Sequence, residues 1–196
     1  MLLPKQLSRS LLFGFSMFVL ACSGTTEEKS TQVTPEKVPL TPEGYQVMAT
    51  DTLATNDRTF VINVLHLSDE DSLIEEMQEL ARPLVILEKK GDDYELLERN
   101  DHVILCGICG GMMGDPWDGL YLEDNAFTVY HAGGSSHRWT RNIKFQYNAE
   151  KEGWFMTSDR GGSYSSFDPQ NTFEMSIYTE GDSLGTVPFA EFETRF

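Results

Sequence analysis

Residues 138–148, RWTRNIKFQYN, constrain the fold more than any other stretch, because their side chains alternate in character. Large apolar side chains fall on one face and polar ones on the other: Trp139, Ile143, Phe145 and Tyr147 against Arg138, Thr140, Lys144 and Gln146. Successive side chains of a β-strand point to opposite faces of the sheet. The pattern therefore predicts a long strand with one buried face.

Comparable strand patterns, separated by turn signals, recur along the chain. The expected elements are a buried strand at 60–67, hairpins at 83–101 and 120–131, and strands at 102–106, 153–158 and 172–180. One segment, 68–83, has a helical period, with Ser68 as a possible N-cap and Pro83 at its end. We expect a mainly β fold: an antiparallel hairpin meander, a curled sheet or barrel-like, with one short helix.

The first 24 residues have the pattern of a lipoprotein signal. Lys5 and Arg9 precede an apolar run at 11–20 that is too short to span a bilayer. Residues 19–22, VLAC, match a lipobox, in which Cys22 is acylated and becomes the new N-terminus. An ordinary signal peptide and an uncleaved anchor are the alternatives.

Three parts are therefore expected: a signal peptide at 1–21, a lipidated Cys22 with a flexible tether at 22–43, and a single mainly β domain at 44–196. The tether is rich in Thr, Glu, Lys and Pro and has little to bury. Ser23 in place of Asp favours the outer membrane. We expect a bacterial outer-membrane protein, attached to the membrane through Cys22, at the periplasmic face or the cell surface.

The chain carries a formal net charge of −16 at pH 7. Removal of residues 1–21 would take away two positive charges, Lys5 and Arg9, and no acid, which gives −18. Such a charge argues against nucleic acid and against direct adhesion to anionic lipid. It favours a basic envelope protein as partner, although an acidic surface also serves solubility alone.

Two of the three cysteines, Cys106 and Cys109, stand two residues apart in the stretch CGIC. In an oxidising envelope we expect them to form a disulfide with each other. A disulfide over so short a loop stabilises by only about 2 kcal/mol. The alternative is a thioredoxin-like thiol–disulfide pair, which needs a helix after the first cysteine. The following GGMMGDPWDG argues against a helix there.

The metal-site alternatives are weak. A structural zinc site joins two Cys/His pairs, and this chain has no second pair. Met112 and Met113 could offer soft ligands for Cu(I), but a disulfide would consume the neighbouring thiolates. Acids near Asp115 lack the spacing of an EF-hand loop. We expect no metal, no cofactor and no catalytic residue.

Arg141 falls on the apolar face of the 138–148 strand, where a buried guanidinium needs a partner. Asp115 and Asp118, in the turn Gly-Asp-Pro-Trp-Asp-Gly, are the nearest plausible acids. We therefore expect a structural ion pair between Arg141 and this turn. A functional alternative uses aromatic and basic residues nearby as a ligand-binding surface: Trp117, Arg138 and Trp139.

The stretches RNDHVILCGICGGMMGDPWDGL, HAGGSSHRWTRNIKFQY and GWF together resemble a domain of uncharacterised bacterial envelope proteins. The resemblance covers about residues 84–156 and implies a β fold with a structural Cys-x-x-Cys disulfide. It implies no activity, catalytic residue or ligand. Together these features predict a non-enzymatic lipoprotein that acts as a binding or scaffold module, with thiol–disulfide chemistry at Cys106 and Cys109 as the alternative.

Overall fold

The computed structural model describes residues 41–55, 57–76, 78–179 and 185–194, all within one compact unit. The expected signal peptide, Cys22 and most of the tether lie outside the described residues. No helix among the described residues is long and apolar enough to cross a membrane.

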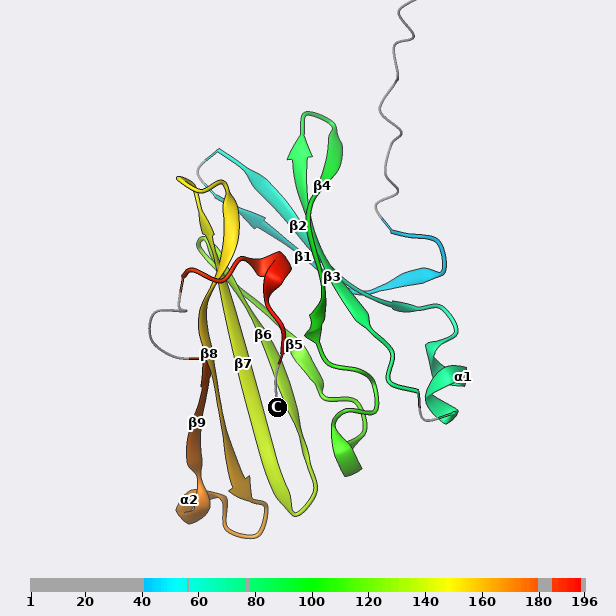
Figure 1. Ribbon diagram of the computed structural model, residues 1–196, viewed down its shortest axis with the longest axis vertical. Helices are drawn as coiled ribbons and strands as arrows, with labels where there is room; N and C mark the ends of the chain where they lie inside the picture. Colours follow the sequence, from blue (N-terminus) through cyan, green and yellow to red (C-terminus); the bar gives the residue numbers. More distant parts are fainter. Residues whose placement is uncertain (1–40, 56, 77, 180–184, 195–196) are drawn as a thin grey trace, which may run out of the picture. The chain divides into compact units, whose positions relative to one another are not determined.

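Nine strands in this part of the chain form two antiparallel sheets, each in sequence order. The first sheet consists of β1 (Tyr45–Ala54), β2 (Thr59–Leu67), β3 (Arg82–Lys90) and β4 (Asp93–Ile104). The second consists of β5 (Trp117–Glu123), β6 (Ala126–Gly134), β7 (His137–Asn148), β8 (Gly153–Ser165) and β9 (Glu174–Thr179). Figure 1 shows the sheets as two layers. The expected mainly β meander is confirmed, and it forms two sheets instead of a closed barrel.

The two sheets share one apolar core. Large side chains from both layers are fully buried there: Phe60, Ile62, Val64, Leu84 and Ile86 from the first, and Phe127, Val129, Ile143, Phe145 and Trp154 from the second. The rings of Phe60 and Trp154 meet edge to face, with centroids 5.3 Å apart. Burial of such aromatic area is the main favourable contribution to folding. The buried face of β7 is the one that its alternation predicts.

The helix between β2 and β3 is shorter than the one predicted for residues 68–83. α1 covers only Glu70–Glu75, and Asp69, without a side-chain cap, precedes it in place of Ser68. Residues 78–81 are irregular, and the last two residues of the predicted helix, Arg82 and Pro83, already belong to β3. Short helices are marginal in water, so a helical period alone does not maintain the longer helix. A second short helix, α2 (Pro169–Thr172), was not expected.

Three strands also differ from the expectation, and one of them, β8, continues to Ser165 instead of ending at residue 158. Residues 102–106 do not form a separate strand, because β4 runs on to Ile104. Asn100 bends it: its side-chain oxygen accepts hydrogen bonds from the backbone N–H groups of His102 and Val103, at 2.7 and 2.9 Å. β1 was not predicted, because its side chains alternate weakly and a register shift interrupts it between Val47 and Ala49.

Candidate functional site

The loop from residue 105 to residue 116, named here the Cys loop, connects the last strand of the first sheet to the first strand of the second. Its cysteines, Cys106 and Cys109, form a disulfide with Cα atoms 5.1 Å apart. The N–H of Cys109 donates to the carbonyl of Cys106 at 3.0 Å, so the disulfide encloses one tight turn. The next helix is the single 3-10 turn η1 (Gly111–Met113), so Cys106 does not begin a helix of the thioredoxin kind.

Backbone contacts hold the Cys loop against the β6–β7 hairpin. The N–H of Gly134 donates to the carbonyl of Gly110 at 2.8 Å. A Cβ at Gly110 would lie 2.2 Å from the carbonyl oxygen of Gly114, and a Cβ at Gly133 would lie 2.4 Å from the ring of Trp139. A larger residue at Gly110 would therefore distort the loop itself, and one at Gly133 would press on the Trp139 ring and, at 2.9 Å, on the carbonyl oxygen of Gly110.

Asp115 joins the Cys loop to the first sheet. Both terminal nitrogens of the Arg82 guanidinium, in β3, donate to its carboxylate at 2.7 Å. The Nε of Arg82 donates to Glu70 at 2.7 Å, and Glu70 also lies 3.0 Å from His66 Nδ1. Burial lowers the pKa of Arg82, but the hydrogen bonds to Asp115 and Glu70 outweigh it and the pKa is raised. The result is a largely buried network between α1, β3 and the loop.

A second buried ion pair lies within the second sheet. Arg141 donates from Nε and Nη2 to the two carboxylate oxygens of Asp159, both at 2.8 Å. The two side chains are 1% and 0% exposed. Thr179 donates to Asp159 at 3.0 Å, and the ring centroid of Tyr178 lies 4.3 Å from the Arg141 guanidinium carbon.

The predicted partner of Arg141 is therefore wrong. Asp115 is paired with Arg82, and the side chain of Asp118 makes no ion pair within the described ranges. Strand register explains the difference: Ile143, two residues along β7 from Arg141, pairs with Asp159, so the two charged groups are diagonal neighbours on one face. Sequence separation gave no information about this register.

His131 lies between the two ion pairs and is 1% exposed. The N–H of Leu105 donates to its Nε2 at 3.3 Å, so Nδ1 carries the proton in the neutral ring. Nδ1 has no hydrogen-bond partner within the described ranges. Burial, and then the charges of Arg141 and Arg82, lower the pKa of His131 to about 4. The sequence signal that could have found this residue is its place on the buried face of β6.

A pocket of about 450 Å³ lies beside the Cys loop. Its lining comes from the η1 turn, the β6–β7 turn, β7 and the segment after β8: Met112, Met113, Gly134, Ser135, Ser136, Arg138, Ser166 and Phe167. Met112 is 90% exposed and Phe167 is 85% exposed. Among the described residues, no hydrogen-bond or ion-pair partner exists for the Arg138 side chain. An unpaired cation among exposed apolar groups suits an acidic group that carries apolar neighbours.

The predicted surface of Trp117, Arg138 and Trp139 is not a single surface in the structure. Arg138 and Trp139 are adjacent in β7, so they point to opposite faces. Trp139 packs over Gly133, and Trp117 packs against the core with its ring centroid 6.4 Å from that of His131. Only Arg138 lines the pocket.

Sequence reasoning missed the apolar side of this pocket. The sequence suggested Met112 only as a metal ligand and assigned no role to Phe167, whereas both side chains are exposed beside the pocket. The signal that could have found them is local: large apolar residues stand within loops rich in Gly, Ser and Asp. Whether such a residue is covered depends on loop conformation.

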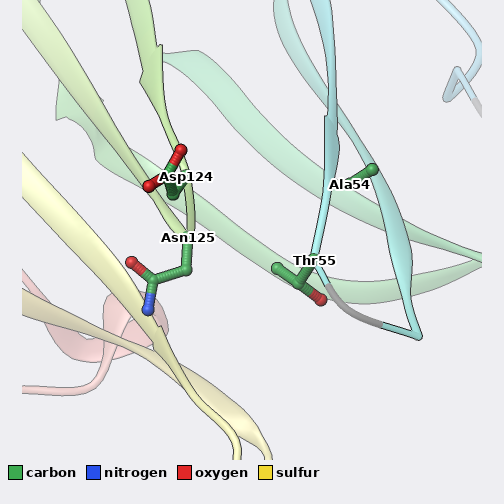
Figure 2. A pocket seen from close by; sticks show the side chains of 4 residues that line it. All are labelled: Ala54, Thr55, Asp124 and Asn125. Atoms are coloured by element: carbon green, nitrogen blue, oxygen red, sulfur yellow. The ribbon is translucent and has the colours of Figure 1, made fainter.

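A second pocket, of about 670 Å³, lies between the β1–β2 turn and the β5–β6 turn (Figure 2). It is lined by Ala54, Thr55, Asp124 and Asn125. The Asn125 carbonyl accepts from the Tyr147 N–H at 2.9 Å, and its side chain accepts from Gln146 at 3.3 Å. These polar groups serve the turn itself, and none of the described lining residues has a large apolar side chain. The Arg138 pocket is therefore the stronger candidate.

The described part of the chain holds no group of three or more His, Cys, Asp or Glu residues placed to bind a metal ion. No family model matches the sequence, and no curated protein and no solved structure matches it either. The candidate site therefore depends on its geometry alone.

Proposed function

We propose that the protein is a non-enzymatic binding module, anchored to the bacterial outer membrane through a lipidated Cys22, and that the Arg138 pocket is its ligand site. The observation that carries this proposal is the Arg138 guanidinium, which has no partner among the described residues, beside the exposed Met112 and Phe167. Large apolar side chains gathered at an exposed site commonly mark an interaction surface.

The surroundings of the pocket support binding because they are fixed before a ligand arrives. The Cys106–Cys109 disulfide closes the turn next to the methionines, and Asp115 is held by two hydrogen bonds from Arg82. The Gly110–Gly134 hydrogen bond ties the loop to the opposite rim. A rim that is already ordered loses less conformational entropy when it binds.

We propose a basic envelope protein as the partner, because the net charge of −16 would attract a cationic surface over distance. At the pocket itself, Arg138 favours an acidic side chain of that partner, with apolar neighbours that cover Met112 and Phe167. Affinity then depends on the apolar contacts, and the charges contribute chiefly orientation and association rate.

Site-specific photo-cross-linking in intact cells tests the site. A photoreactive residue at Met112 should give one defined adduct with an envelope protein. The same residue at Tyr121, which is 57% exposed on β5 away from the pocket, should not. Arg138→Glu should remove the Met112 adduct, and the matched control Arg160→Glu should keep it. An adduct that is equal at both positions, or unchanged by Arg138→Glu, would contradict the proposal.

The anchor has its own test. Cys22→Ser should move the protein from the membrane fraction to the soluble periplasmic fraction, and the N-terminal peptide of the wild type should carry the mass of acyl chains. A wild-type N-terminus without acyl mass would overturn the anchor and leave the pocket unaffected.

A further inference from the structure

β9 is the last strand of the second sheet, and Figure 1 shows it at the outer edge. Two of its side chains are apolar and exposed, Met175 at 69% and Ile177 at 45%, and Phe173, the extended residue just before the strand, is 54% exposed. Met175 pairs with Gly162 of β8, and the ring of Phe173 lies over that glycine beside Met175. Within the described residues, the strand thus presents both an unpaired backbone edge and exposed apolar side chains.

The other edge strands carry the features that usually prevent edge pairing. β1 has a register shift between Val47 and Ala49, and β5 has one between Trp117 and Gly119. β4 is rich in charged residues, and its Asn100 side chain donates to the carbonyl oxygens of Phe189 and Phe192, next to the 3-10 turn η3 (Phe189–Glu191). All three edges are therefore irregular or covered.

β9 lacks this protection over most of its length. Glu174 is its one charged residue, and the pairing with β8 stays regular from Glu174 to Ile177. The register shift comes only at Tyr178, whose ring turns toward Arg141. Residues 174–177 thus form a short and regular edge segment with two exposed apolar side chains, and Phe173 directly precedes it.

We propose that β9 pairs antiparallel with the β9 strand of a second copy of this chain, around a two-fold axis at Met175. In this register Met175 faces the second copy's Met175, Phe173 faces its Ile177, and Glu174 faces its Ser176. Directly opposed residues of an antiparallel pair share a face, so the exposed apolar side chains meet on one face. No like charges stand directly opposite each other.

The segment favours a second copy because its pattern is complementary to itself under two-fold symmetry. Two five-stranded sheets would join into one continuous sheet.

Cysteine cross-linking of the full chain in isolated envelope membranes tests the register. Under mild oxidation Met175→Cys should give a dimer on a non-reducing gel. Tyr121→Cys, on the opposite edge strand of the same sheet, should not. Phe173→Cys and Ile177→Cys should each stay monomeric when expressed alone, and should cross-link when expressed together. Equal cross-linking at Met175 and Tyr121, or a Met175→Cys adduct with a different protein, would overturn the proposal.

A second measurement does not depend on disulfide formation. The purified full chain in detergent should sediment as a dimer, Met175→Lys should sediment as a monomer, and Tyr121→Lys should remain dimeric. Because Met175 is exposed, all three proteins should have the same far-ultraviolet circular dichroism. A monomeric wild type at micromolar concentration would refute the dimer. Arg138→Glu should leave the dimer intact, so this proposal and the pocket can fail separately.

Discussion

Arg82 and Asp115 face each other through two parallel hydrogen bonds of 2.7 Å, one from each terminal guanidinium nitrogen. This pair joins the first sheet to the Cys loop and so fixes the rim of the candidate pocket. Arg82 is 4% exposed, whereas the Asp115 side chain is 45% exposed. The two ends of one ion pair are therefore expected to differ in how much their removal costs.

Arg82→Ala should lower the free energy of unfolding by about 3–5 kcal/mol, because it leaves the buried Glu70 carboxylate without its cation. Asp115→Ala should cost less, since water can reach that end of the pair. Urea unfolding of both variants measures the difference. Arg99→Ala, in an exposed pair with Asp101, is the control and should change stability by less than about 1 kcal/mol. A larger loss from Asp115→Ala than from Arg82→Ala would contradict this description.

Asp159→Ala should also cost about 3–5 kcal/mol, because Arg141 would stay buried without its carboxylate. The double variant Arg141→Met/Asp159→Leu should recover much of this loss, since both charges are gone. A double-mutant cycle should give strong coupling between Arg141 and Asp159 and little coupling between Arg141 and Asp115. Strong coupling of Arg141 with Asp115 and little with Asp159 would instead support the ion pair expected from the sequence.

Stability should fall in acid because of His131. Its pKa is about 4 in the folded protein against 6.5 in the unfolded chain, so between these values the unfolded state binds the extra proton. His131 therefore stabilises the folded state fully above pH 6.5. As the pH falls toward 4, up to roughly 3 kcal/mol of unfolding free energy is lost. His131→Gln should flatten the curve of unfolding free energy against pH in this window. An unchanged slope would mean that other groups cause the acid sensitivity.

Glu98 should have the opposite pH dependence. Burial raises the pKa of its carboxyl above 4.5. Hydrogen bonds from the N–H groups of Trp154 and Ala190 lower this pKa, but by less than burial raises it. The unfolded state therefore loses its proton first, and stability is lost as the pH rises above about 4.5. Glu98→Gln keeps an oxygen that can accept from the Trp154 N–H, bonded at 2.9 Å in the wild type. This variant should melt at a higher temperature than the wild type at pH 7, and the gap should close near pH 4.

The Cys106–Cys109 disulfide should resist reduction. Cys106 is buried, and no helix begins there to stabilise a thiolate. Equilibration in defined thiol buffers, with alkylation and mass measurement, should give a reduction potential below roughly −300 mV. A potential between about −120 and −230 mV would favour the thiol–disulfide alternative. In that case, Ser replacements at both cysteines should abolish thiol–disulfide exchange without unfolding the domain.

Several features of the fold could be predicted because they are local. Alternation over residues 138–148 identified β7 and its buried face, and the Asp124–Asn125 pair identified the β5–β6 turn. Both depend on side-chain period and turn chemistry, which a short window of sequence contains. The predicted helix 68–83 was too long: α1 ends at Glu75, and residues 82 and 83 belong to β3, because a short helix without a side-chain cap is only marginally stable.

The sequence by itself determined that the domain is mainly β, that Cys106 and Cys109 are close enough to pair, and that Arg141 needs a buried acid. Only the tertiary structure decided that this acid is Asp159, that Asp115 pairs with Arg82, and that Arg138 lines a pocket while Trp139 packs away from it. The physical reason is that strand register and loop conformation bring together residues distant in the chain. Their energies depend on burial and on geometry to within about an ångström, which no local pattern contains.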